Sequence, residues 1–197
     1  MPAVARDASS PEQREQLRFS PEEYYALAEQ NLIPEHTELV DGQIIKMPAQ
    51  FYPAVAAIIQ IVTTLHREWH DPRGVASDLM HPFPSGWNPR PDVALYDVPP
   101  PRRPGDRPHP EPRLVIEVAD TTLDYDLGEK AARYADEGVA ELWVADPDAR
   151  HLWVHREPAD GTYTSRQRLT AEDTVTPLCL PELPLRVDDL LPAYPDE

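Results

Sequence analysis

Two carboxylates and a lysine stand at positions where the sequence predicts that they could act together. Asp92 opens a short apolar run, Glu117 interrupts a second run over residues 114–118, and Lys130 follows in a helix-forming segment. Two acids on neighbouring strands beside a lysine form the layout needed for metal-assisted phosphodiester hydrolysis. Hard oxygen ligands favour Mg²⁺ or Mn²⁺ over zinc. In that chemistry the lysine orients a water or stabilises developing charge.

The run around Glu117 predicts a strand that is buried on both faces. Side chains alternate along a strand, so Leu114, Ile116 and Val118 face one way, and Val115 and Glu117 face the other. A buried carboxylate without a partner is costly, so Glu117 should have a metal, a cation or a raised pKa. The alternative is a carboxylate at the strand end that reaches water.

The segment after this strand predicts a loop that leads into a helix. Asp126 with Glu129 resembles a capping box, and the helix should run to about Glu137 and stop at Gly138. Helical periodicity places Lys130 at the edge of the apolar face, leaning toward the sheet and Glu117. The alternative is an ordinary lysine that snorkels at a helix border and adds little to stability.

Composition bounds the class of protein. With 197 residues and 41% hydrophobic content, we expect one domain over residues 18–197 after a disordered tail over residues 1–17. A net charge of −17 argues against coating nucleic acid by bulk charge, so any DNA contact must be local or metal-assisted. The single Cys179, the absence of an 18-residue apolar run and the lack of a signal-peptide pattern favour a cytoplasmic protein without a membrane span.

The other elements follow from local patterns. Ser20-Pro21 predicts a helix start, and Asp41-Gly42 predicts the turn of a hairpin. Glu38, in the first strand of that hairpin, is either an exposed carboxylate or an acid aimed at a site. Apolar residues at helical spacing predict a long core helix from about 52 to 70, namely Val55, Ile58, Ile59, Val62, Leu65 and Trp69. Further strands are expected at residues 75–83, 93–96, 140–145, 151–155 and 163–169.

Two further groups leave alternatives open. His66 and His70 have a metal-compatible spacing, but without a third ligand nearby a solvated helix face is favoured. The proline-rich stretch 97–112 is either a passive connection or a mobile basic flap. In the second case Arg102, Arg103 and Arg107 would contact DNA phosphates.

Ordered short motifs of the chain resemble the Uma-two family of putative restriction endonucleases, in the PD-(D/E)XK nuclease superfamily. The resemblance covers about residues 19–191. The motifs are Glu38-Leu39-Val40-Asp41-Gly42, Arg90-Pro91-Asp92-Val93-Ala94, Leu114-Val115-Ile116-Glu117-Val118, Asp126-Leu127-Gly128-Glu129-Lys130 through Tyr134, and the segment 138–147.

That resemblance implies a fold and a set of roles. The fold would be α/β and restriction-endonuclease-like, with a mixed central sheet flanked by helices. The activity would be DNA cleavage dependent on Mg²⁺ or Mn²⁺, with Asp92, Glu117 and the Val118 carbonyl as metal ligands. Lys130 would be the catalytic lysine and Glu38 an accessory acid.

The chain also departs from the related patterns. The superfamily's usual lysine lies two residues after the glutamate, where this chain has Ala119, and Lys130 fits a migration of the amine to the helix. Gln50-Phe51-Tyr52 replaces a frequent His-Gly, and Asp120-Thr121-Thr122 replaces Ser-Pro.

Other classes of function remain alternatives. One is a catalytically silent nuclease-fold module for binding or regulation, which the acidic composition favours. Another is an acidic metabolic hydrolase, although no Ser/His/Asp or Cys/His set supports it. Enzymes of this fold often pair, so a homodimer is expected, with the Trp143 and Trp153 strands and the leucine-rich C-terminus as its interface.

Overall fold

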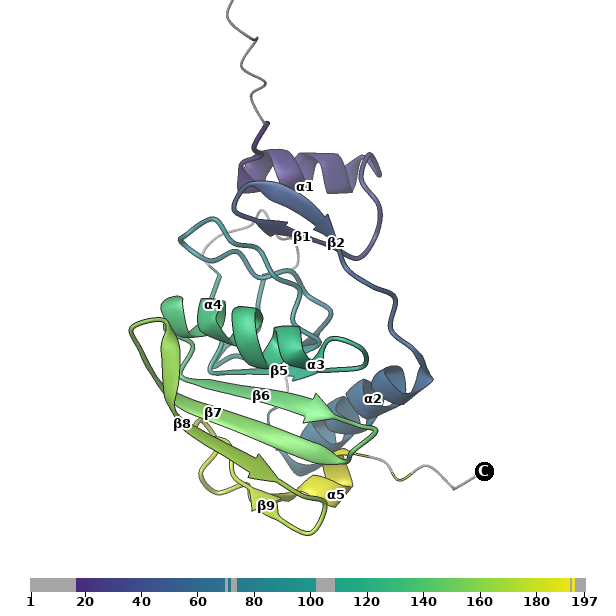
Figure 1. Ribbon diagram of the computed structural model, residues 1–197, viewed down its shortest axis with the longest axis vertical. Helices are drawn as coiled ribbons and strands as arrows, with labels where there is room; N and C mark the ends of the chain where they lie inside the picture. Colours follow the sequence, from purple (N-terminus) through teal and green to yellow (C-terminus); the bar gives the residue numbers. More distant parts are fainter. Residues whose placement is uncertain (1–16, 70, 72–73, 102–108, 192, 194–197) are drawn as a thin grey trace, which may run out of the picture.

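A mixed sheet forms the centre of the molecule in the computed structural model, which describes residues 17–69, 71, 74–101, 109–191 and 193 (Figure 1). The sheet has six strands in the order β3-β4-β5-β6-β7-β8. β5 and β6 are parallel, and every other neighbouring pair is antiparallel. The strands are β3 Val75–Ser77, β4 Val93–Leu95, β5 Leu114–Val118, β6 Glu141–Asp146, β7 His151–Ala159 and β8 Thr162–Leu169. The α/β architecture expected from the sequence is confirmed.

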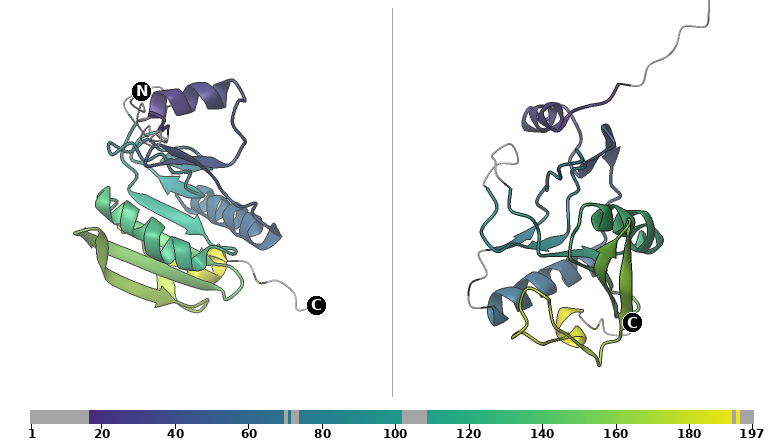
Figure 2. Two further views of the ribbon diagram at one scale, coloured as in Figure 1. Left: turned by 45° about the horizontal axis from the view of Figure 1, so that its top comes forward. Right: turned by 90° about the vertical axis from the view of Figure 1, so that its left-hand side faces the viewer.

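Helices cover both faces of this sheet (Figure 2). On one face α2, Tyr52–Glu68, packs against β5 and against the short helix α5, Val187–Leu190. On the other face α4, Ala131–Asp136, packs against β7 and β8. Each face has its own buried apolar cluster. The sheet is therefore enclosed on both sides, as its continuous apolar strands predict.

Strand β5 shows the predicted alternation. Leu114, Ile116 and Val118 belong to the cluster under α2, whereas Val115 belongs to the cluster under α4. Every residue of the strand is buried. Glu117 shares the side of Val115, so a carboxylate enters the layer between the sheet and the helix that carries Tyr134.

A smaller layer at one end of the molecule is built from α1, Pro21–Glu29, and the hairpin of β1, Thr37–Val40, and β2, Gln43–Lys46 (Figure 1). Ser20 and Glu23 form the capping box that starts α1. The turn residues Asp41 and Gly42 both have positive φ, 51° and 76°, as a two-residue hairpin turn requires. Both sequence predictions are confirmed.

Leu39 joins the hairpin to the segment that leads into β4. Leu39 is fully buried and exchanges two backbone hydrogen bonds with Asn88, of 3.2 and 2.9 Å. The Tyr25 hydroxyl donates to the Asn88 side chain. These contacts fix the hairpin against the approach to β4, and they position Glu38 beside Arg90.

Helix α2 corrects one expectation. Val55 and Ile59 were expected in the core but are 40% and 61% exposed. The buried stripe consists of smaller residues with two large aliphatic ones, namely Ala54, Ala57, Ile61, Thr64 and Leu65. The prediction is therefore wrong at Val55 and Ile59. Leu65 is buried as expected, and Ile58, Val62 and Trp69 are partly buried and pack against the core.

The C-terminal part completes the core under α2. β9, Thr174–Val175, pairs with β10, Leu185–Arg186, and both precede α5. Trp143 is 1% exposed and four of the C-terminal leucines lie in the core, so these side chains pack within the chain, and the expected homodimer stays a prediction. Those leucines are Leu180, Leu185, Leu190 and Leu191. In the described part of the chain, no helix has the length and apolar character to cross a membrane.

Candidate active site

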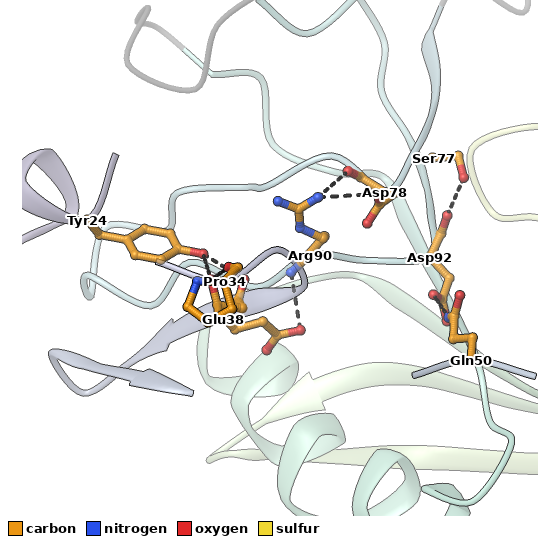
Figure 3. A network of polar contacts seen from close by, with 9 residues as sticks. Tyr24, Pro34, Glu38, Gln50, Ser77, Asp78, Arg90 and Asp92 are labelled. Carbon is orange, nitrogen blue, oxygen red and sulfur yellow. Dashed lines mark hydrogen bonds and ion pairs between the residues drawn. The ribbon is translucent and has the colours of Figure 1, made fainter. Parts of the chain in front are cut away.

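Asp92 lies at the start of β4, next to the end of β5. The register pairs Val93 with Ile116, so the two strands place Asp92 beside Glu117. The Val118 backbone N–H donates to Asp92 Oδ2 at 2.7 Å, and the Gln50 side chain donates to Oδ1. The Asp92 carbonyl also accepts from the Ser77 hydroxyl at 2.8 Å (Figure 3). Neighbouring segments therefore hold both the carboxylate and the backbone carbonyl of Asp92.

Glu117 is 3% exposed and has two partners on the same oxygen. The Tyr134 hydroxyl donates to Glu117 Oε1 at 2.6 Å, and Lys130 Nζ lies 3.0 Å from it. Glu117 is therefore neither a strand-end carboxylate in water nor an unpaired buried charge. Ala119, two residues after Glu117, is buried in the apolar cluster under α4, and the amine beside Glu117 is that of Lys130 on the following helical segment.

Lys130 lies at the end of a π-helical turn. The helix starts at Leu123, four residues earlier than an N-cap at Asp126 implies, with α3 over Leu123–Tyr125 and the π-turn η2 over Asp126–Lys130. Asp126 is therefore not the N-cap, and the predicted capping box with Glu129 is wrong. π-turns often occur at functional sites, because the extra residue redirects side chains. Here Asp126 and Lys130 are the two buried residues of the turn.

The burial of Lys130 excludes the snorkelling alternative. Its side chain is 5% exposed, and the amine is shared by Glu117 and Glu38, with Glu38 Oε1 at 3.3 Å. An ammonium this deep depends on its partners, because it has lost most of its water. A border lysine of the expected kind would have kept its amine in solvent.

Glu38 is the acid that the hairpin brings to the site. Its side chain is 1% exposed, and Oε1 accepts the Arg90 backbone N–H at 3.3 Å (Figure 3). Glu38 Oε2 is buried and has no hydrogen-bond partner among the described residues. The reading of Glu38 as an exposed strand carboxylate is therefore wrong, and one of its oxygens remains available to a ligand.

The carboxylates outnumber the cation that they share. Burial raises the pKa of Glu117 to about 8 and that of Asp92 to about 6, although Lys130 opposes both shifts. Burial also raises the pKa of Asp126. Burial alone would lower the pKa of Lys130, but Glu117, Glu38 and the two aspartates together raise it well above its ordinary value. The site holds an excess of negative charge that one ammonium does not balance.

Three site contacts come from positions where the chain departs from the family pattern. Gln50 donates to Asp92, the Asp120 carboxylate accepts the Phe51 backbone N–H at 2.9 Å, and the Thr122 hydroxyl donates to Asp126 at 2.6 Å. Asp126 was not among the predicted site residues. The signal in the sequence was that Asp126 lies four residues before Lys130. Asp126 was instead predicted to be the cap of the helix.

These groups line one cavity of about 420 Å³. Asp92, Glu117, Asp126, Lys130 and Glu38 all reach it. Its wall also contains the exposed aliphatic side of α2, including Ile59 that was expected in the core. Counted over the whole lining, six carboxylates face two cations, Arg90 and Lys130.

The donor set suits a hydrated hard cation. Within the described ranges, no three side chains of His, Cys, Asp or Glu converge closely enough to hold an ion on their own. Mg²⁺ keeps several waters and needs only one or two carboxylates, which Asp92 and Glu117 can supply. The orphaned Glu38 Oε2 adds a buried acceptor for a ligand of the ion. A caged zinc site does not fit these residues.

The remaining predicted residues lie elsewhere. Arg102, Arg103 and Arg107 fall outside the described residues, as do His70 and the N-terminal tail up to residue 16. His66 Nδ1 lies 2.8 Å from the Val62 carbonyl in its own helix, which agrees with a solvated helix face. Val118 contributes its N–H to Asp92, and the role expected of its carbonyl remains a prediction.

Comparisons with known proteins agree with this architecture. The crystal structure of a putative nuclease belonging to DUF820 from Anabaena variabilis ATCC 29413 superposes with a TM-score of 0.63. At 19% identity, the match covers 83% of this chain and 96% of the other. This likeness shows that the two proteins share one fold. No curated protein matched the sequence.

The model of the Uma2 (Uma-two) family, described as putative restriction endonuclease, matches residues 21–188. The chain belongs to this family, so the resemblance found in the sequence motifs is confirmed.

Proposed function

We propose that this protein is a DNA endonuclease that hydrolyses phosphodiester bonds with the help of Mg²⁺ or Mn²⁺ bound at Asp92 and Glu117. The observation that carries the proposal is the buried excess of carboxylates around one lysine in a single cavity. Membership of a family described as restriction endonucleases supports the same reaction class. The fold alone would not, since one fold hosts many functions.

The carboxylates have complementary roles in this proposal. Asp92 and Glu117 supply metal ligands from two adjacent strands, with the Val118 carbonyl as the third protein ligand. Glu38, whose Oε2 is buried without a partner among the described residues, would accept a hydrogen bond from a ligand of the bound ion. A bound divalent ion supplies Lewis acidity and lowers the pKa of its water.

Lys130 acts as a cation in this proposal. Because its pKa is raised well above the ordinary value, the amine stays protonated near neutral pH and cannot accept a proton from water. It therefore orients the attacking water and stabilises charge that develops on the phosphate. Its two carboxylate partners fix the position of Nζ before substrate arrives.

Cleavage assays on supercoiled plasmid test the proposal. Wild type should nick DNA with Mg²⁺ or Mn²⁺ and not with EDTA, and Asp92→Asn should lose this activity. Asp97→Asn is the matched control, because Asp97 is an exposed aspartate near the other end of β4, 68% exposed at its side chain. Equal cleavage by wild type and Asp92→Asn would refute the assignment.

Calorimetric titration with Mn²⁺ tests the metal separately. Since the pKa of Glu117 is raised to about 8, Mn²⁺ must displace a proton at pH 7, and affinity should rise by up to about tenfold per pH unit between pH 6 and 8. The heat should vary with the ionisation enthalpy of the buffer. Asp92→Asn should bind much more weakly than Asp97→Asn.

A binding or regulatory module is the second candidate. The acidic composition and the engagement of Lys130 by two carboxylates favour it. Mn²⁺ binding together with a complete failure of wild type to cut plasmid, duplex and single-stranded DNA would make it the better description.

A further inference from the structure

A second cavity adjoins the candidate active site. It has a volume of about 520 Å³ and lies between the outer side of the hairpin and the helical segment that follows β5. Met47, Pro48 and Thr122 line both cavities, so the two lie side by side with these residues between them. We call this second cavity the hairpin groove.

The hairpin groove has the opposite charge balance from the active-site cavity. Its lining contains three cations, Arg18, Lys46 and Arg133, and two carboxylates, Asp41 and Glu129. In a chain of net charge −17 such a balance is unusual, because nearly twice as many acidic as basic residues are available to line a cavity. A local basic groove is the feature that an acidic nucleic-acid-binding protein needs.

The three cations differ in whether other side chains already bind them. Arg133 makes ion pairs with Asp41 at 3.0 Å and Glu129 at 3.3 Å, which ties the hairpin turn to α4. Arg18 donates to the Asp41 backbone carbonyl and makes no ion pair with the described residues. Lys46 is exposed at the end of β2, and its amine has no partner among the described residues. Arg133 therefore shapes the groove, whereas Lys46 and Arg18 can take a ligand.

Apolar side chains complete the groove. Ile45 is 40% exposed, and the partly buried Tyr125 lines the cavity on the helical side. A cationic rim with an aromatic or aliphatic wall is the combination that holds single nucleic-acid strands, with phosphates at the cations and bases or sugars against the wall.

We propose that the hairpin groove holds the nucleic-acid strand adjoining the scissile phosphate, with Lys46 and Arg18 contacting its phosphates. This inference rests on the proposed nuclease function, because the groove gains its meaning from the site that it adjoins. The occupant is a single DNA strand, since the groove offers a base-sized apolar wall rather than a surface for a duplex. Lys46 and Arg18 are binding residues here and take no part in the chemical step.

The test measures binding of a fluorescent single-stranded oligonucleotide with Ca²⁺, over a series of salt concentrations. Lys46→Gln should bind about fivefold more weakly at 0.1 M salt and lower the salt slope by about 0.7, the value for one phosphate contact on a single strand. The double variant Arg18→Gln/Lys46→Gln should lose about 25-fold. Arg168→Gln is the matched control, because Arg168 lies on β8 over Trp153 and carries the same charge.

Lys46→Gln and Arg168→Gln binding equally well would overturn the inference. The melting temperature of each variant is measured alongside, and Lys46 has no described ion pair to lose. Hydrolysis of bis(p-nitrophenyl) phosphate by wild type with Mn²⁺ tests the proposed nuclease function independently, because this diester is too small to span both cavities. Hydrolysis without a Lys46 effect refutes the groove alone, whereas no hydrolysis with a clear Lys46 effect refutes the nuclease and retains the groove.

Discussion

The active-site cavity and the hairpin groove share a wall but use charge in opposite ways. In the first, Lys130 is buried at 5% exposure and pairs with Glu117 and Glu38. In the second, Lys46 is exposed and has no described partner. The same side-chain type is therefore part of a buried ion-pair network in one place and an exposed charge in the other.

This difference teaches how an acidic protein can act on an anionic polymer. The acidic cavity is unfavourable for a phosphate until a divalent ion offsets its carboxylates. The adjoining groove already carries the net positive charge that attracts phosphate. Under the proposed function, metal binding and strand binding depend on each other through charge, so tight DNA binding should require a divalent ion.

The largest expected effect comes from removing the buried cation. Lys130→Met keeps the apolar stem and leaves Glu117 and Glu38 without their shared ammonium. We expect a loss of about 3–5 kcal/mol in the free energy of unfolding at pH 9, the usual cost of an orphaned partner of a buried ion pair. The loss should be smaller at pH 5, where the raised pKa of Glu117 keeps this carboxyl group protonated. Urea denaturation at both pH values measures it.

The control for that experiment is Lys46→Met, which removes a solvated amine and should leave stability unchanged within error. A small loss for Lys130→Met at both pH values would mean that its amine reaches water in solution. From the sequence alone, Lys130 substitution is expected to leave folding nearly unaltered. The burial of the side chain reverses that expectation.

An intermediate effect is expected from Glu117→Gln, which keeps the shape of the side chain and removes its charge. Folding raises the pKa of Glu117 from 4.5 to about 8, so its contribution to stability is present below pH 4.5 and is lost as pH rises to about 8. The metal-free variant should therefore have a flatter pH profile and melt about 2–4 °C higher at pH 8, for a gain of about 1 kcal/mol.

Glu117→Gln should abolish cleavage while it raises this melting temperature. The opposite directions of these two effects matter, because a variant that merely unfolded would show less cleavage and a lower melting temperature. Parallel profiles of wild type and Glu117→Gln between pH 5 and 8 would contradict the raised pKa.

The sequence predicted the helices, strands and turns better than it predicted which residues would surround them. Alternation along residues 114–118 placed Glu117 on the correct face, and the Asp-Gly turn placed the hairpin. Both patterns are local, since each depends on backbone geometry within a few residues. The family motifs brought together the four predicted side chains Glu38, Asp92, Glu117 and Lys130 in one cavity.

What the sequence could not supply depends on contacts between distant segments. The depth of Lys130 depends on the hairpin closing over the helix, which brings Glu38 within 3.3 Å. Because of the π-turn, Asp126 lines the cavity and does not cap the helix, and a period of 3.6 residues cannot anticipate this difference. The exposed apolar side of α2 was taken for core because periodicity identifies a stripe without showing what covers it.

The smallest expected effect lies where the two cavities meet, at Thr122. Its hydroxyl donates to the buried Asp126 at 2.6 Å, and this bond opposes the effect of burial in raising the Asp126 pKa. Thr122→Val should cost about 0.5–1 kcal/mol, because a buried acceptor loses its donor without a change in shape. Since the Asp126 pKa would rise further, more stability is lost as pH increases, and the deficit should be larger at pH 8 than at pH 5.

Thr122→Ser should restore stability, and Thr121→Val, at an exposed neighbour, is the control. Equal deficits for Thr122→Val at both pH values would show that the pKa of Asp126 does not depend on the Thr122 hydroxyl.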